Sequence, residues 1–384
     1  MAIGEVEDEA SLALLKDAAA QVDVALADAA AAKIVTLAAA RNYSIDSEIA
    51  VFFRKTSATR EDCDARAREI VGDGNVVPVD TQGACSYTVY AGPELEYVVQ
   101  FRLKSLALKT ALSGSATAIY GSLVPRVSLK GKLGEEGDGE KEPLYVYLMT
   151  RMPGITQLDF ILAHGFPEDS PDNLLWRKTL MGDVAQFMAL SWKAPQAASP
   201  EYRSRLRKTY VTDLELLSTS LPSRFQPIIQ TCIDAIDDIL SLPMVLLYED
   251  FGASNILVDE ATCHLVGVID WAEAEVCPFG LNLHSIRFLS GKIHLRNGWM
   301  RYEDYDALQE AFWDTLKREV GGLSDHQLRT IKLARALGLL RSDGFTPRFA
   351  NEQEPVPIND DEHGRYNMMS LDRFLINPET KFDF

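Results

Sequence analysis

The fold of this chain is decided by two stretches in its second half, LLYEDFGASNILVD at residues 246–259 and VGVIDWAEAEVCPFGLNL at residues 266–283. In the first stretch, an apolar run predicts a strand that ends just before Asp250, and Asn255 follows after four intervening residues. In the second, Asp270 closes a Val-Gly-Val-Ile run, which predicts another strand that ends in a carboxylate. Two strand ends therefore carry three polar residues at defined spacing.

This order and spacing are typical of phosphoryl-transfer enzymes of the kinase type. One carboxylate accepts the proton of the attacking hydroxyl, and a short turn brings an amide oxygen back to hold a metal ion. A second carboxylate bridges the metal ions that neutralise charge on the transferred phosphoryl group. We therefore predict Asp250 as the catalytic base and Asn255 and Asp270 as metal ligands. The alternative is that all three are turn residues that cap strand ends, as Asx residues often do.

The tripeptide Asp250, Phe251 and Gly252 has the spelling that marks the metal-binding aspartate of protein kinases. Asn255 follows it closely, however, and Asp270 closes a further strand later in the chain. The position of Asp250 relative to Asn255 and Asp270 is better evidence than the identity of the tripeptide, so we assign Asp250 to the catalytic loop.

Composition limits the partners of the chain. It has 384 residues, of which 47% are hydrophobic, so a disulfide-stapled mini-protein and global disorder are both excluded. The net charge of -18 argues against binding a nucleic-acid backbone by bulk electrostatics. An acidic start and the lack of an apolar run of about 18 residues predict a soluble, cytoplasmic protein without a membrane partner. The sequence does not indicate the oligomeric state.

The pattern along the chain divides it into three parts. Residues 1–45 are rich in Ala and predict an N-terminal helical extension. Residues 46–154 predict a β-rich N-lobe, with three antiparallel strands within 76–103, a helix over 106–120 and a solvated hairpin loop at 131–143 before a last strand. Residues 155–384 predict a mainly helical C-lobe with one strand-rich island at 245–269.

These stretches resemble the aminoglycoside phosphotransferase and choline kinase-like family, and its fungal members in particular. The resemblance covers about residues 50–384 and is carried by stretches such as PMVLLYEDFGASNILVDEATCHLVGVIDWAEA and RFLINPETKF. It implies an α+β, protein-kinase-like two-lobed fold, with a small β-rich N-lobe and a larger helical C-lobe. It also implies that ATP and Mg²⁺ are used to transfer the γ-phosphoryl group to a hydroxyl of a small-molecule acceptor.

The resemblance further implies a nucleotide site between the lobes. Adenine is expected on the backbone of a hinge at residues 149–152, and the phosphates beneath a covering hairpin. The residues expected at this cofactor site are Ser86, Gln100, Arg102, Met149, Arg151 and Met152. At the acceptor site, Glu273 is expected to line the pocket, and Trp271 belongs either to the core or to a substrate platform.

Three departures from the family pattern stand out. Tyr248 occupies a position that is usually His, and we expect it to pack and hydrogen-bond within the catalytic loop. Gln100 stands where most kinases have the phosphate-pairing Lys, and the helix that follows contains no Glu to pair with such a cation. Arg102, two residues on and on the same strand face, is a partial substitute for the Lys or else a solvent-facing residue.

Two other functions therefore stay open. One is a pseudokinase-like binding protein that keeps the fold and has lost turnover, as the missing Lys and Glu would allow. The other is a kinase fold repurposed for a different reaction in specialised metabolism, because one fold hosts many chemistries.

Overall fold

The computed structural model describes residues 44–135, 141–248, 250–294, 298–347 and 355–384. The helical extension predicted at residues 1–45 lies almost wholly outside the described residues.

The N-terminal part is built on one antiparallel sheet in the order β1-β2-β3-β5-β4. Its strands are β1 (Asn75–Pro78), β2 (Ser86–Gly92), β3 (Tyr97–Leu103), β4 (Val127–Leu133) and β5 (Leu144–Thr150). The three antiparallel strands predicted between residues 76 and 103 are confirmed. Residues 131–133 of the predicted loop belong instead to β4, which pairs with β5 up to Leu133.

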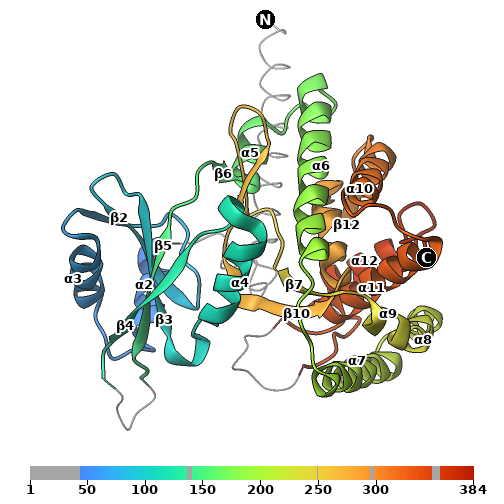
Figure 1. Ribbon diagram of the computed structural model, residues 1–384, viewed down its shortest axis with the longest axis horizontal. Helices are drawn as coiled ribbons and strands as arrows, with labels where there is room; N and C mark the ends of the chain where they lie inside the picture. The colour runs from blue at the N-terminus through green and yellow to red at the C-terminus, as the bar shows by residue number, and fades with distance from the viewer. Residues whose placement is uncertain (1–43, 136–140, 249, 295–297, 348–354) are drawn as a thin grey trace, which may run out of the picture.

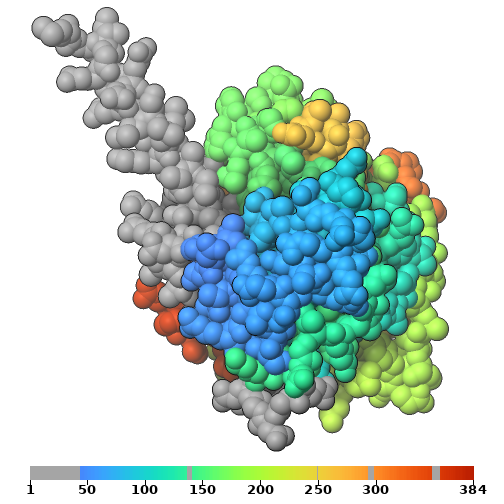
Figure 2. All heavy atoms as spheres, turned by 90° about the vertical axis from the view of Figure 1, so that its left-hand side faces the viewer, coloured from blue at the N-terminus to red at the C-terminus, as the bar shows by residue number. Residues whose placement is uncertain are grey.

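Two helices, α2 (Ile45–Phe53) and α3 (Arg60–Val71), pack on this sheet (Figure 1). Thr59 and Asp62 form a capping box at the start of α3, and Gly72 ends the helix in the left-handed conformation. The buried side chains between helices and sheet include Phe52, Cys63, Tyr87, Phe101 and Val146. Figure 2 shows this part, in blue, in front of the green and orange residues of the helical part.

The helix predicted over residues 106–120 begins later than expected, as α4 (Thr110–Tyr120). The 3₁₀ turn η2 (Lys104–Leu106) precedes it. Here the carbonyl of Leu106 accepts a hydrogen bond from Arg102, and the amide of Leu108 donates to the hydroxyl of Tyr147. These bonds take both groups out of helical pairing and so delay the start of the helix.

The C-terminal part is mainly helical, as predicted. Its helices are α5 (Gln157–His164), α6 (Pro171–Lys193), α7 (Pro200–Ser220), α8 (Gln226–Asp234), α9 (Ile236–Ser241), α10 (Tyr305–Glu319), α11 (Asp325–Asp343) and α12 (Arg365–Leu371). Ser170 and Ser199 cap α6 and α7, and each is followed by Pro at the first helical position. Helices α6 and α10 each bury an apolar face, which includes Leu180 and Val184 in α6 and Phe312 and Leu316 in α10.

Short strands at the centre of the molecule carry the loops of the predicted island. β6 (Ile155–Thr156), β8 (Ile256–Val258) and β9 (Leu265–Val268) form one sheet, and β7 (Met244–Tyr248) pairs with β10 (Ala274–Pro278). α4 contacts β7 and β10, and α6 contacts β7 and β9 (Figure 1). The remaining short elements are η3 (Gly121–Leu123), η4 (Ser223–Phe225), η5 (Trp271–Glu273), η6 (Leu281–Leu289), β11 (Gly291–His294), β12 (Gly298–Arg301) and the π-helical turn η7 (Asp372–Ile376). Among the described residues, no helix is long and apolar enough to span a bilayer.

Candidate active site between the sheet and the helical part

The loop between β7 and β8 brings Asp250 and Asn255 together, as the sequence predicted. The backbone turns sharply, with the amide of Gly252 donating to Asp250 O and that of Asn255 donating to Gly252 O. The side chain of Asn255 then reaches back, and its Nδ2 lies 3.0 Å from Asp250 O and 2.9 Å from Asp250 Oδ2. One amide nitrogen therefore fixes both the backbone and the carboxylate of Asp250.

Asp270 joins this pair from the end of β9. The amide of Ile269 donates to Asn255 O at 2.9 Å, so the two loops are fastened side by side. Asp270 itself has a left-handed backbone, with φ 61° and ψ 60°, which a non-glycine residue adopts only where its surroundings hold it. Its side chain is 48% exposed, so the carboxylate is open to solvent.

The carboxyl group of Asp250 titrates unusually. Surrounding protein atoms desolvate the charge, although the residue is partly exposed, and the negative charge of Asp270 adds to this effect. The hydrogen bond from Asn255 opposes both, and Glu273 contributes in the same sense as Asp270. Together they raise the pKa of Asp250 to about 6.

Four side chains on β2 and β3 form a polar row that faces Asp270. Ser86 lies opposite Arg102 in the sheet register, and Thr88 lies opposite Gln100. Thr88 Oγ1 is 3.3 Å from Ser86 Oγ and 3.4 Å from Gln100 Nε2, and Gln100 Oε1 is 3.4 Å from Arg102 Nη1. The structure thus brings together three predicted residues and adds Thr88, which alternation along the strand places on the same face as Ser86.

Arg102 ends the polar row beneath the cleft. It is only 4% exposed, which excludes the alternative that it faces solvent. Its Nε donates to Leu106 O at 2.8 Å, and its Nη1 lies 3.9 Å from Asp270 Oδ1. A buried cation from the sheet therefore meets a carboxylate from the other part of the molecule. As predicted, α4 has the sequence TALSGSATAIY and offers no Glu to this cation.

The hinge after β5 is fastened at several points. Arg151 donates from its amide to Glu96 O and from Nη1 to Leu95 O, and its guanidinium lies 3.9 Å from the ring centre of Tyr90. Arg151 therefore fixes the hinge to the turn between β2 and β3. Met149 pairs with Val98 and Val127 in the sheet.

Met152, the last of the predicted hinge contacts, packs against the strand that leads to Asp270. A Cβ placed on Gly267 would lie 3.0 Å from Met152 Cε. A side chain larger than Gly at this point of β9 would therefore push on the hinge.

Trp271 belongs to the core. It is 7% exposed, its Nε1 donates to Val268 O at 3.0 Å, and its ring stacks on Tyr248 with centroids 5.1 Å apart. From the sequence, Trp271 could belong either to the core or to a substrate platform. Glu273 follows in η5, where it is exposed and close enough to act on the pKa of Asp250.

Tyr248 packs within the catalytic loop as expected, between Trp271 and Phe251. The expected hydrogen bond from its hydroxyl is absent, because that buried hydroxyl has no partner among the described residues. Asn282 Nδ2 instead donates to the backbone oxygen of Tyr248 at 3.2 Å. The sequence analysis missed Asn282, whose distance along the chain gave no sign of this contact.

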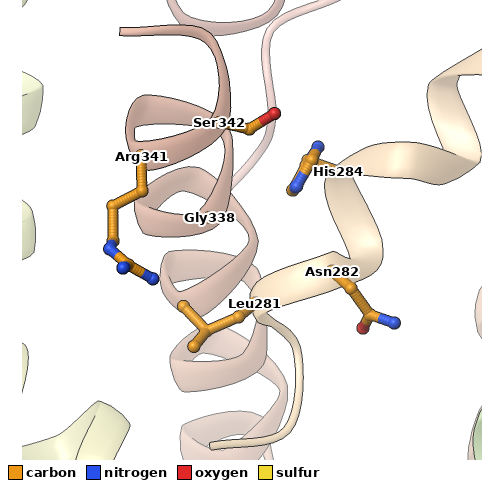
Figure 3. A pocket seen from close by; sticks show the side chains of 6 residues that line it. All are labelled: Leu281, Asn282, His284, Gly338, Arg341 and Ser342. Atoms are coloured by element: carbon orange, nitrogen blue, oxygen red, sulfur yellow. The ribbon is translucent and has the colours of Figure 1, made fainter. Parts of the chain in front are cut away.

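A cavity of about 140 Å³ lies behind this support, between η6 and α11. Figure 3 shows it with the six residues that line it: Leu281, Asn282, His284, Gly338, Arg341 and Ser342. The strand that leads into the loop with Asp250 and Asn255 is therefore held by η6, which packs directly on α11.

Among the described residues, no three His, Cys, Asp or Glu side chains are grouped so that they could hold a metal ion by themselves. A metal at Asp270 and Asn255 would need further ligands from a substrate or from water.

Several solved structures are similar to this chain. The GDP complex of aminoglycoside 2'-phosphotransferase-IIIa is 12% identical, with a TM-score of 0.47 over 80% of this chain and 95% of that chain. A glucosamine kinase is 14% identical, with a TM-score of 0.45 over 70% and 74%. The aminoglycoside phosphotransferase APH(3'')-Id from Streptomyces rimosus ATCC10970 is 13% identical, with a TM-score of 0.40 over 71% and 95%. These TM-scores are too low to carry an argument about function. No curated protein matches the sequence.

The family model of the phosphotransferase enzyme family matches residues 105–283, from η2 to η6. This range holds the hinge, the catalytic loop and Asp270. The likeness to fungal members in particular is not tested and stays a prediction. The α+β, two-lobed fold of protein-kinase type is confirmed by this match together with the sheet and helices described above. The segment of this chain that carries Asp250, Asn255 and Asp270 is therefore similar to the phosphotransferase enzyme family.

Proposed function

We propose that this protein transfers the γ-phosphoryl group of ATP to a hydroxyl of a small molecule, with Mg²⁺ as cofactor. The observation that carries the proposal is the meeting of Asp250, Asn255 and Asp270 at one point of the cleft, with the Arg102 guanidinium 3.9 Å from Asp270. The family match over this segment supports it. ATP as the phosphoryl donor is also consistent with the cytoplasmic location that the sequence predicts.

Asp250 is the proposed base. A carboxylate with a pKa of about 6 is largely ionised at neutral pH, yet it is more basic than an ordinary Asp. It can therefore orient the acceptor hydroxyl and take up its proton. The Asn255 amide holds the carboxylate in place for this step.

The residues present fit a Mg²⁺ ion, although no cluster of three acidic side chains surrounds them. Mg²⁺ in phosphoryl-transfer sites is held by one or two protein oxygens together with substrate phosphates and water. Asp270 offers a half-exposed carboxylate, and Asn255 uses its amide nitrogen toward Asp250, so its Oδ1 is a second oxygen of the right kind. When bound, Mg²⁺ neutralises charge on the phosphoryl group.

Arg102 is the proposed cation for the phosphates, and the hinge at residues 149–152 is the proposed place for adenine. A guanidinium is suited to phosphate oxygens because its N–H groups form a planar fork. We propose Ser86 and Thr88 as further contacts of the phosphates, because they continue the polar row from Arg102. Glu273 is the proposed acceptor contact, since it lies near the carboxyl group of Asp250.

A second candidate is a binding protein without turnover, favoured by Gln100 in place of the usual Lys and by the absence of Glu from α4. Both candidates share the fold, so only binding and turnover separate them.

Calorimetry of ATP binding with and without Mg²⁺ tests the proposal on three proteins: wild type, Asp270→Ala and the exposed control Asp360→Ala. We expect Mg²⁺-dependent binding in the wild type and the control, and its loss in Asp270→Ala. An ADP-release screen over small-molecule alcohols then tests turnover. Absence of ATP binding in the wild type would exclude the proposed function, and binding without turnover across the screen would favour the second candidate.

A further inference from the structure

The side chain of Arg102 is a buried charge that needs support. A guanidinium taken out of water is costly unless hydrogen bonds and opposite charge compensate it. Its nearest carboxylate, Asp270, lies at 3.9 Å, which is longer than a hydrogen bond. The direct hydrogen bonds come from elsewhere, with Leu106 O at 2.8 Å from Nε and Gln100 Oε1 at 3.4 Å from Nη1.

Only one orientation of the Gln100 amide satisfies both of its neighbours. Arg102 can only donate, so Oε1 must face it, and the amide nitrogen then faces the hydroxyl of Thr88, which can accept. The reverse orientation would set a donor against a donor. Gln100 therefore links the guanidinium to the hydroxyls of β2 through a defined chain of hydrogen bonds.

This chain of bonds is anchored in the loop between β1 and β2. The buried side chain of Gln82 accepts from Thr88 N at 3.0 Å and donates to Thr88 O at 2.8 Å. The loop that would cover the phosphates and the cation that would bind them are thus fixed to the same two strands.

A lysine at position 100 would not serve in this arrangement. Lys has no acceptor for the Arg102 guanidinium, and it would place a like charge two residues away on the same strand face. α4, which carries no acidic residue, could not compensate for a second cation.

We propose that Gln100 is a positioning residue that holds the Arg102 guanidinium toward the triphosphate of the nucleotide. This inference rests on the proposed function, because it assumes a nucleotide in the cleft. In protein kinases, a Glu on a helix positions the cation that binds the phosphates, whereas here a residue of the sheet would do so. The cation is therefore set in place by β3 and its neighbours, independently of α4.

The test compares the binding of Mg–ATP with the binding of adenosine by calorimetry, in wild type, Gln100→Leu and Gln100→Lys. We expect Kd for Mg–ATP to rise about five- to tenfold in both variants, since a hydrogen bond to a charged group is lost. The Kd for adenosine should not change, because adenosine does not reach the cation. Gln230→Leu, the same change at an exposed site on α8, should behave as the wild type.

A double-mutant cycle separates positioning from packing. If Gln100 acts through Arg102, Gln100→Leu should cause no further loss of Mg–ATP affinity in an Arg102→Met background. A loss of equal size in that background would overturn the proposal, and so would a parallel loss of adenosine affinity.

Loss of the positioning role and loss of the proposed function give different binding results. If the wild type binds Mg–ATP and Gln100→Lys binds it equally well or better, the positioning role is wrong and the proposed function stands. If the wild type binds adenosine and gains nothing from the triphosphate, the proposed function falls and the positioning role falls with it.

Discussion

At the scale of single residues, the carboxyl group of Asp250 is held by contacts that also set its basicity. Asn255 stabilises the ionised form of Asp250, while desolvation and the charge of Asp270 destabilise it. Desolvation and Asp270 together outweigh Asn255, so the pKa of Asp250 is raised. A base of this kind is useful only if a hydroxyl approaches it, so its removal should affect the chemical step far more than nucleotide binding.

Asp250→Asn should therefore lower kcat by about 10²–10⁴-fold, the usual contribution of a general base. Mg–ATP binding should stay within about threefold of the wild type, because the amide is of nearly the same size and makes no new charge contact. Acceptor-dependent ADP release and calorimetry give the two numbers. Unchanged turnover would show that Asp250 is not the base.

A second residue-scale prediction concerns His284, which is fully buried on η6. Burial lowers its pKa well below 6.5, and the positive charges of Arg287 and Arg335 add to this effect. The folded protein therefore keeps His284 neutral, while the unfolded chain takes up a proton below about pH 6.5. The contribution of His284 to the free energy of unfolding is therefore complete above about pH 6.5. Below that pH, it decreases by up to about 1.4 kcal/mol per pH unit.

Urea unfolding at pH 7.5, 6.5 and 5.5 measures this loss. His284→Gln should be less stable than the wild type at pH 7.5, and the difference should shrink by about 1 kcal/mol at pH 5.5. Asp250 titrates in the same range but is common to both proteins, so it cancels in the comparison. A constant difference across the three pH values would contradict the prediction.

At the scale of elements, α11 approaches η6 most closely at Gly338. A Cβ on Gly338 would lie 1.7 Å from Leu281 O, so any side chain there must push the helix away. Gly182 in α6 has nothing within 4 Å of the same position. The two glycines thus offer the same substitution in opposite environments.

Gly338→Ala should lower the free energy of unfolding by about 1–3 kcal/mol, the usual cost of overpacking. Gly182→Ala should raise it by up to about 1 kcal/mol, because Ala favours a helix more than Gly does. Urea unfolding of both variants checks the signs. Equal effects would mean that η6 moves away from α11 without cost.

The elements also show how far the sequence alone could reach. The strands at 76–103 and the spacing of Asp250, Asn255 and Asp270 are local patterns, and alternation and strand ends sufficed to find them. The start of α4 was predicted too early, because it depends on bonds from Arg102 and Tyr147 that only the folded sheet supplies.

For the same reason, the contact of Asn282 with the backbone of Tyr248 was not predicted, because it joins distant segments of the chain. Thr88 was missed although a local signal pointed to it, since alternation along β2 places it on the same face as Ser86. The roles of the cofactor-site residues stay predictions until binding is measured.

At the scale of the whole molecule, α4 connects the two parts. It lies between two strands of the N-terminal sheet in sequence, yet Ala116 and Tyr120 belong to the hydrophobic cluster of the helical part. Tyr120 stacks on Phe187 with centroids 4.3 Å apart, and its hydroxyl donates to Leu246 O in β7.

Tyr120→Phe should reduce the free energy of unfolding by about 1 kcal/mol, the net value of one buried hydrogen bond. Tyr120→Ala should reduce it by about 3–5 kcal/mol, because it also leaves a cavity between α4 and α6. Thermal and urea unfolding measure both. Two equal losses would show that the ring contributes nothing beyond its hydroxyl.

The hydrogen bonds that hold Arg102 to Gln100 and Leu106 also affect how fast the first turnover can begin. Arg102 is already positioned by residues of its own strand and of the turn that follows. No helix therefore has to move before the guanidinium can bind the phosphate oxygens. The first turnover after rapid mixing with Mg–ATP and acceptor should therefore start without a lag. A slow activation phase would show that some other part of the chain has still to move.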